Sequence, residues 1–266
     1  MAALAGAATG HGKVITASAH GSAMAMEALT PVQQARANGL ASFAAGYTFA
    51  PERTTLPAGA RSAFRFRILD AHGRAVHNFD LDGGVRLHVI VVRRDFAGYQ
   101  HVHPTLQPDG SWSVPLTLAA AGTYRAFADF EVAGVKTVLG SDLFVPGAFA
   151  PARLPAAAAT VASDGYAVNL EGADLHAGKE TQLHFFVSRN GRPVSAFETY
   201  VGHRGHLVAL RAGDLAYSHV HPEPAGRPGE IVFHTELPTA GAYRLFMQFK
   251  LAGVVHTAAF TVEVKR

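Results

Sequence analysis

The sequence predicts an all-β protein made of two tandem β-sandwich domains, of immunoglobulin-like or cupredoxin-like type. Three observations support this prediction. The chain contains an internal repeat, its apolar residues fall in short segments with strand alternation, and turn residues separate these segments every 8–12 positions. No long stretch has the 3.6-residue period of an amphipathic helix. Both sandwich topologies fit this pattern, so the choice between them stays open at this point.

The internal repeat relates segments that are 118 or 119 positions apart. Between 73–104 and 191–222, 13 of 32 positions are identical without a gap. The tetrapeptide His-Val-His-Pro at 101–104 returns at 219–222. Matches this dense and in the same order indicate a duplicated domain.

The repeat also sets the expected domain boundaries. The first sandwich is expected at 46–146 and the second at 165–266, each about 100 residues long, which is the usual size of such a domain. Residues 147–164 are rich in proline and alanine and are predicted to be a linker. Residues 1–45 are rich in Ala, Gly and Ser and are predicted to be a flexible leader, with the remnant of an export signal as an alternative.

Individual strands can be recognised within each copy. Phenylalanine and isoleucine alternate with arginine over 64–68, which predicts a half-buried strand. The segment 87–92 is rich in β-branched residues. Tyr124 and Tyr243 each follow a glycine turn and open a Tyr-Arg-x-Phe strand. A tyrosine in this place is typical of the tyrosine corner of immunoglobulin-like sandwiches.

Composition narrows the function classes. The 266 residues carry a net charge of +3, and the basic residues form no stripe with aromatic platforms, which argues against nucleic-acid binding. No apolar run approaches the 20 residues of a transmembrane helix. There is no cysteine, which excludes disulfides, thiolate metal sites and a blue-copper centre. No nucleophile elbow, phosphate loop or zinc-protease motif is present.

Histidine is frequent, with 15 residues, and six of these recur at matching positions of the two copies. The separations within each copy are 13 and then 2 residues. The six are His88, His101 and His103 in the first copy, and His206, His219 and His221 in the second.

This spacing predicts a metal site in each repeat. Side chains at i and i+2 of a strand share a face, so His101 and His103 are neighbours. A hairpin whose paired residue numbers sum to an odd value brings His88 to the same face. Three imidazoles in this arrangement can bind one ion at metal–nitrogen distances of about 2.0–2.1 Å. In the second copy His203, three residues before His206, is a candidate fourth ligand.

An all-imidazole site without thiolate suits Cu(II), Zn(II) or Ni(II), and the general order of affinities favours copper. Because ligands must be neutral, binding is expected to weaken from pH 8 to pH 5 if the histidines titrate normally. The alternative is structural: the imidazoles form hydrogen bonds at a strand end or pack against Tyr99 and Tyr217.

Several motifs of the second copy resemble a family of largely uncharacterised exported bacterial proteins associated with heavy-metal, especially copper, handling. The resemblance covers residues 46–266 and implies domains similar to the immunoglobulin-like sandwiches of the FixH and YtkA type. It implies His206, His219 and His221 as ligands, and in the first copy His88, His101 and His103. The first copy departs from the pattern, because Leu87 stands where the second has Gly205. The motifs are Gly205-His206-Leu207-Val208, Asp214-Leu215, Ser218-His219-Val220-His221-Pro222 and Ala240-Gly241-x-Tyr243-Arg244.

The leading functional hypothesis is a non-catalytic copper or zinc buffer, chaperone or sensor. It would be exported to the periplasm or beyond, although the N-terminus has no convincing signal peptide. Its partners would be the metal ion and another exported or membrane protein. A tandem module for protein interaction or structure, with structural histidines, is the alternative. A metal-dependent enzyme is the third class, with Glu198 and Glu223 as the nearest acidic groups.

Overall fold

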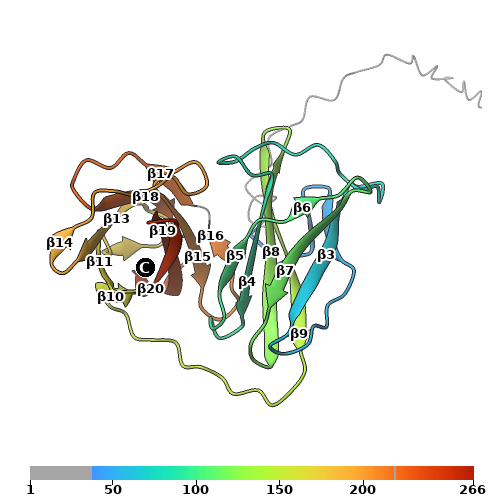
Figure 1. Cartoon of the computed structure of the whole chain (residues 1–266), viewed down its shortest axis with the longest axis horizontal. Helices are drawn as coiled ribbons and strands as arrows, with labels where there is room; N and C mark the ends of the chain where they lie inside the picture. The colour runs from blue at the N-terminus through green and yellow to red at the C-terminus, as the bar shows by residue number, and fades with distance from the viewer. Residues whose placement is uncertain (1–37, 219) are drawn as a thin grey trace, which may run out of the picture.

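The structure is a computed structural model, and it describes residues 38–218 and 220–266. These residues form strands and connecting loops, without a helix, and fold into two β-sandwiches that lie side by side (Figure 1). The prediction of two tandem all-β domains is therefore confirmed. Within this part of the chain no helix is long and apolar enough to cross a membrane.

The first sandwich pairs a five-stranded sheet, β1-β2-β3-β7-β6, with a four-stranded sheet, β5-β4-β8-β9. The strands are β1 (Phe43–Ala44), β2 (Tyr47–Pro51), β3 (Arg61–Leu69), β4 (Leu87–Arg93), β5 (Gln100–Val102), β6 (Thr105–Leu106), β7 (Ser111–Thr117), β8 (Gly122–Val132) and β9 (Val135–Val145).

The second sandwich repeats this plan. One sheet has the order β10-β11-β13-β18-β17, with β14 paired to β13, and the other has the order β12-β20-β19-β15-β16. Its first strand falls inside the segment 147–164 that composition predicts as linker. The strands are β10 (Thr160–Ser163), β11 (Tyr166–Glu171), β12 (Leu175–His176), β13 (Glu180–Arg189), β14 (Arg192–Pro193), β15 (Gly205–Arg211), β16 (Tyr217–Ser218), β17 (Val220–Glu223), β18 (Glu230–Glu236), β19 (Gly241–Leu251) and β20 (Val254–Lys265).

The strand order resolves the topology left open by the sequence. In the first domain β2, β3, β7 and β6 follow the A-B-E-D order of an immunoglobulin sheet, while β4, β8 and β9 follow C-F-G with β5 beside C. Both expected tyrosine corners are present at the start of the F strand. Tyr124 donates its hydroxyl hydrogen to the carbonyl of Ala120 at 2.8 Å, and Tyr243 to that of Thr239 at 3.2 Å. The domains are immunoglobulin-like.

Each sandwich has its own apolar core. On β3, Phe64, Phe66 and Ile68 are buried, while the arginines between them reach the surface. This is the alternation expected of a strand with one face on a core. The same periodicity places Leu183, Phe185 and others of β13 inside the second domain.

A third apolar cluster joins the two domains. All seven residues of β4 are buried, because the strand is covered on both faces. Val89 and Val91 face the core of the first domain, and Ile90 and Val92 face the second domain. The members of this interdomain cluster are Ile90, Val92, Phe127, Val138, Val208, Leu210, Leu215, Tyr217 and Phe246, with Phe96, Tyr99 and Ala259 packed against them.

Contacts across this interface are reciprocal. Tyr99 of the first repeat stacks on Phe246 of the second, with ring centroids 4.0 Å apart. The equivalent pair with the repeats exchanged, Tyr217 and Phe127, has centroids 5.7 Å apart. The two repeats therefore meet through the same surface, as the subunits of a two-fold dimer do.

The turns before β4 and β15 also meet at this interface. Gly83 has a φ of 58°, and a Cβ atom added to it would lie 2.1 Å from the carbonyl oxygen of Val201. Val201 is the equivalent of Gly83 in the second repeat. Glycine is thus required at position 83 for close backbone approach.

Replacing Phe246 with alanine should destabilise the protein by about 3 kcal/mol, because this 3% exposed ring fills the interface against Tyr99. The free energy of unfolding can be measured by chemical denaturation. Val255→Ala, at a 38% exposed position, is the control and should change stability by less than about 0.5 kcal/mol. Equal losses in the two variants would contradict a packed interface.

Candidate metal centre

The hairpin of β4 and β5 positions the first histidines. Ile90 pairs with His101 and Val89 with Val102, so the paired residue numbers sum to an odd value, as the hypothesis required. His88 and His103 directly follow the last pair of this ladder, Val89 and Val102, so extending the same register by one position sets them opposite each other. Paired residues point to the same face of a sheet, here the face that meets the second domain.

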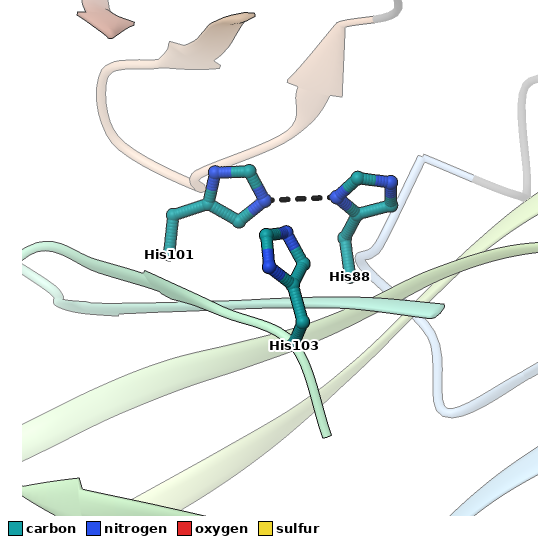
Figure 2. A group of neighbouring side chains, drawn as sticks. All are labelled: His88, His101 and His103. Carbon is teal, nitrogen blue, oxygen red and sulfur yellow. Dashed lines mark hydrogen bonds between the residues drawn. The ribbon is translucent and has the colours of Figure 1, made fainter. Parts of the chain in front are cut away.

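The three imidazoles of the first repeat converge (Figure 2). His88 Nδ1 and His101 Nε2 are 2.9 Å apart and share a hydrogen bond. The ring centroid of His103 lies 5.1 Å from that of His88 and 4.9 Å from that of His101. One nitrogen from each ring lies within 4.8 Å of the others, so these residues could hold a metal ion.

His206 of the second repeat joins this group. Its ring stacks on His88 with centroids 5.3 Å apart and lies 4.5 Å from His101. His88 and His206 are equivalent positions of the repeat, so the reciprocal interface brings them face to face. We call His88, His101, His103 and His206 the histidine cluster.

Hydrogen bonds from the second domain fix the tautomer of His101. Gln248 donates its amide Nε2 hydrogen to Thr257 Oγ1 at 3.1 Å, which leaves its Oε1 as an acceptor 2.7 Å from His101 Nδ1. His101 must then carry its proton on Nδ1, with the lone pair of Nε2 directed at the cluster. A ring held through its other nitrogen in this way is typical of metal-ligating histidines. Tyr200 lies beside the same Nδ1, with its hydroxyl at 3.3 Å.

Burial keeps the cluster neutral. Desolvation, with the neighbouring imidazoles His101 and His103, lowers the pKa of His88 to about 3. Desolvation also lowers the pKa of His206 to about 3, and it lowers the pKa values of His101 and His103. Neutral imidazole is the form that binds metal.

Two nitrogens of the cluster lack hydrogen-bond partners. His103 Nε2 and His206 Nδ1 are buried, and neither has a partner among residues 38–218 and 220–266. Buried polar atoms are nearly always paired, so each orphan needs an explanation. A metal ion would provide one.

The other predicted ligands are placed differently. His203 is exposed in the turn whose backbone pairs with Tyr200. His221 lies on β17 and pairs with His234 of β18, in the sheet opposite to that of His206. His219 lies outside the described residues. The second repeat therefore does not gather His206 and His221 on one sheet as the first gathers His88 and His101.

A cavity of about 50 Å³ adjoins the cluster between the two domains. His88 and His206 form part of its wall, so it reaches the cluster directly. Polar side chains from both repeats complete the lining, among them Asp82, Asp129, Lys136, His203 and His221. The cavity is large enough for a few water molecules.

Asp129 and Gln248 were missed by the sequence analysis. They occupy equivalent positions, with Asp129 paired to His88 on β8 and Gln248 paired to His206 on β19. Burial raises the pKa of Asp129 to about 6, and the charge of Lys136 and the Tyr217 hydroxyl oppose this rise. A polar residue between two apolar neighbours, at matching positions of the two strands, was the available indication.

Comparison with known proteins places the chain in a family. A family model described as "Domain of unknown function (DUF8832)" matches twice, over residues 42–145 and 159–266. The chain belongs to this family. The domain of this family is thus duplicated here, as the internal repeat predicted. No curated protein sequence matches the chain.

Solved structures show weak likenesses. The Escherichia coli adhesin FdeC is 17% identical over 83% of this chain and 64% of its own, with a TM-score of 0.28. Salmonella alpha-2-macroglobulin reacted with methylamine is 13% identical over 84% of this chain and 15% of its own, with a TM-score of 0.31. Yersinia pseudotuberculosis InvD is 13% identical over 82% of this chain and 57% of its own, with a TM-score of 0.28. The chain spans less than two thirds of each of these structures, and scores this low say nothing about function.

The free energy of unfolding of the metal-free protein should decrease as the pH is lowered. The pKa values of His88 and His206 are about 3 in the folded state against 6.5 for an ordinary histidine, so the unfolded chain binds more protons between these values. Their contribution is complete above about pH 6.5 and is lost as the pH falls toward 3. We expect a loss exceeding about 2 kcal/mol between pH 7 and pH 4.5, measured by urea unfolding.

The comparison protein is His88→Gln/His206→Gln, in which this pH dependence should be much smaller. Asp129, with its raised pKa, acts in the opposite direction between about pH 4 and pH 6. It is present in both proteins and cancels in the difference. The same pH dependence in parent and variant would contradict neutral, buried imidazoles.

Proposed function

We propose that this protein binds one transition-metal ion, copper or zinc, at the histidine cluster between its two repeats, without catalysing a reaction. It acts as a buffer, chaperone or sensor for that ion. The observation that carries the proposal is the convergence of the His88, His101 and His103 imidazoles, against which the ring of His206 packs. His103 and His206 each have a buried nitrogen without a hydrogen-bond partner among the described residues.

The geometry of the cluster suits an ion with short bonds to nitrogen. Two ligands at a right angle on an ion with bonds of 2.0–2.1 Å lie about 2.9 Å apart, and tetrahedral ligands lie about 3.3 Å apart. The 2.9 Å between His88 Nδ1 and His101 Nε2 is close to both. The ion would take the place of the proton now shared by these atoms. Imidazole ligands favour Cu(II) over Zn(II) in affinity, with Zn(II) as the second choice.

A fourth imidazole beside the group of three favours binding over catalysis. Structural zinc sites are closed by four ligands, whereas catalytic sites keep one position for water or substrate. Here three imidazole nitrogens lie within 4.8 Å of one another, the adjacent ring of His206 is the candidate fourth ligand, and neither Glu198 nor Glu223 lines the adjoining cavity. Glu198 instead pairs with Lys250 at 3.2 Å. An exported location and delivery to a membrane or exported partner are part of the proposal and derive from the family resemblance.

Counting bound metal tests the proposal. The protein is purified without a tag, loaded with Cu(II) or Zn(II), desalted and measured by mass spectrometry. We expect about one ion per chain in the parent and almost none in His101→Ala/His103→Ala. The control is His176→Ala/His234→Ala, because neither residue belongs to the cluster, and it should bind like the parent.

A parent protein that retains no metal would contradict the proposal. In that case the alternative function is favoured, a rigid tandem module for protein interaction or structure. The contacts of Tyr99 with Phe246 and of Tyr217 with Phe127 would hold its domains together, and the imidazoles would only fill the interface. Two tightly bound ions in the parent and one in His101→Ala/His103→Ala would instead support a separate site in each repeat.

Replacing Gln248 with methionine should weaken metal binding by about 10- to 100-fold, the usual effect of removing a hydrogen bond to a ligating histidine. Methionine keeps the length of this 5% exposed side chain but cannot accept the Nδ1 proton of His101. Affinity is measured by competition with a chelator. Gln182→Met, at an exposed position of β13, is the control, and unchanged affinity in Gln248→Met would contradict the assigned tautomer.

A further inference from the structure

We propose that the cavity beside the cluster is the route by which metal ions reach it, with Asp82, His203 and His221 as a capture group at its outer end. The inference rests on the proposed function and concerns how the site is filled. It is distinct from the equilibrium site itself, so the two can be tested separately.

A route from the surface matters because the cluster lies between the domains, with His88 buried and His101, His103 and His206 half-buried. His88 is only 4% exposed, and the interdomain apolar cluster adjoins it through Ile90. The cavity joins this interior to the surface. Its inner wall includes His88 and His206, and its outer residues His203 and His221 are exposed. Histidine side chains therefore line both the buried and the exposed part of this cavity.

The charges of the cavity favour a cation. Asp82 and Asp129 line it, and Lys136 is the lining residue of opposite charge. Lys136 binds Asp82 at 2.8 Å, and its charge partly offsets the rise that burial causes in the pKa of Asp129. With both carboxylates ionised, the three groups sum to −1. An excess of one sign in a cleft attracts ions of the other sign and raises their association rate.

The two repeats differ in sequence around the interface, and among the described residues acidic side chains line it only on the side of Asp82 and Asp129. The equivalents of Asp82, Asp129 and Lys136 in the second repeat are Tyr200, Gln248 and Val255. On that side Tyr200 and Gln248 contact His101 and cover it. The pseudo-symmetric interface is therefore closed by neutral groups on one side, while the other side holds the polar cavity.

The capture group is a transient stop and not a second permanent site. Within residues 38–218 and 220–266, three donor atoms come within 4.8 Å of one another only in His88, His101 and His103. Around the cavity, a hydrated ion would exchange one water molecule at a time for a carboxylate oxygen or an imidazole nitrogen. It would then pass to His206 and His88, and the released water returns to solvent. No electron is transferred in this process.

Stopped-flow uptake of Cu(II) by the metal-free chain tests the proposal. We expect His203→Ala/His221→Ala and Asp82→Asn to slow uptake by about tenfold, with the same final content of one ion. Lys136→Gln should accelerate uptake, because it removes the positive charge that opposes the incoming ion. Lys265→Gln removes a charge that pairs with Asp174 and is the matched control, with an unchanged rate. Added salt should reduce the differences among the charge variants.

Unchanged rates in the cavity variants would overturn the proposal. So would loss of the bound ion in His203→Ala/His221→Ala, because these residues would then be permanent ligands. A parent protein that binds no Cu(II) would instead refute the proposed function, which the metal count detects independently.

Discussion

The packing of β4 against β15 across the boundary between the repeats is the constraint on which the site depends. Each strand is apolar on both faces, so each must cover one face with its own sandwich and the other with the neighbouring domain. The cost of exposing Ile90, Val92, Val208 and Leu210 holds the two domains in one arrangement. That arrangement fixes the distance between His88 and His206 and brings the rings of His101 and His103 beside them.

Burial of these imidazoles has consequences for their chemistry. A histidine removed from water and placed beside other histidines resists protonation, so the cluster stays neutral over a wide range of pH. The expectation of weak binding near pH 5 assumed ordinary pKa values and must be revised, because proton competition at this site begins at lower pH. Gln248 adds directionality, since it holds the Nδ1 proton of His101 and leaves Nε2 for the ion.

Much of the fold follows from the sequence. Three features depend on local spacing, which a single sequence contains: the alternation on β3, the two tyrosine corners, and the odd hairpin register that brings His88, His101 and His103 together. The contribution of His206 to the same cluster depends on how two separate domains dock, and spacing within one repeat holds no information about that. The unbroken apolar runs of β4 and β15 do indicate burial of both faces. They do not identify the covering surface.

The two copies also differ where the sequence suggests equivalence. In the second repeat the chain reaches the opposite sheet at Val220, so His221 pairs with β18 although its spacing from His206 matches that of His103 from His88. Local identity of a motif thus does not ensure identical pairing, because β5 ends at Val102 whereas its equivalent β16 ends at Ser218, and the chain crosses between the sheets after this strand.

The most direct test of the account is a crystal structure of the protein loaded with Cu(II) or Zn(II), with the ion located by its anomalous scattering. A shared site requires one strong peak between β4, β5 and β15, with the ion bonded at about 2.0–2.1 Å to nitrogens from both repeats, including that of His206. An ion held by residues of one repeat alone, or no peak at the histidine cluster, would contradict a site shared across the interface.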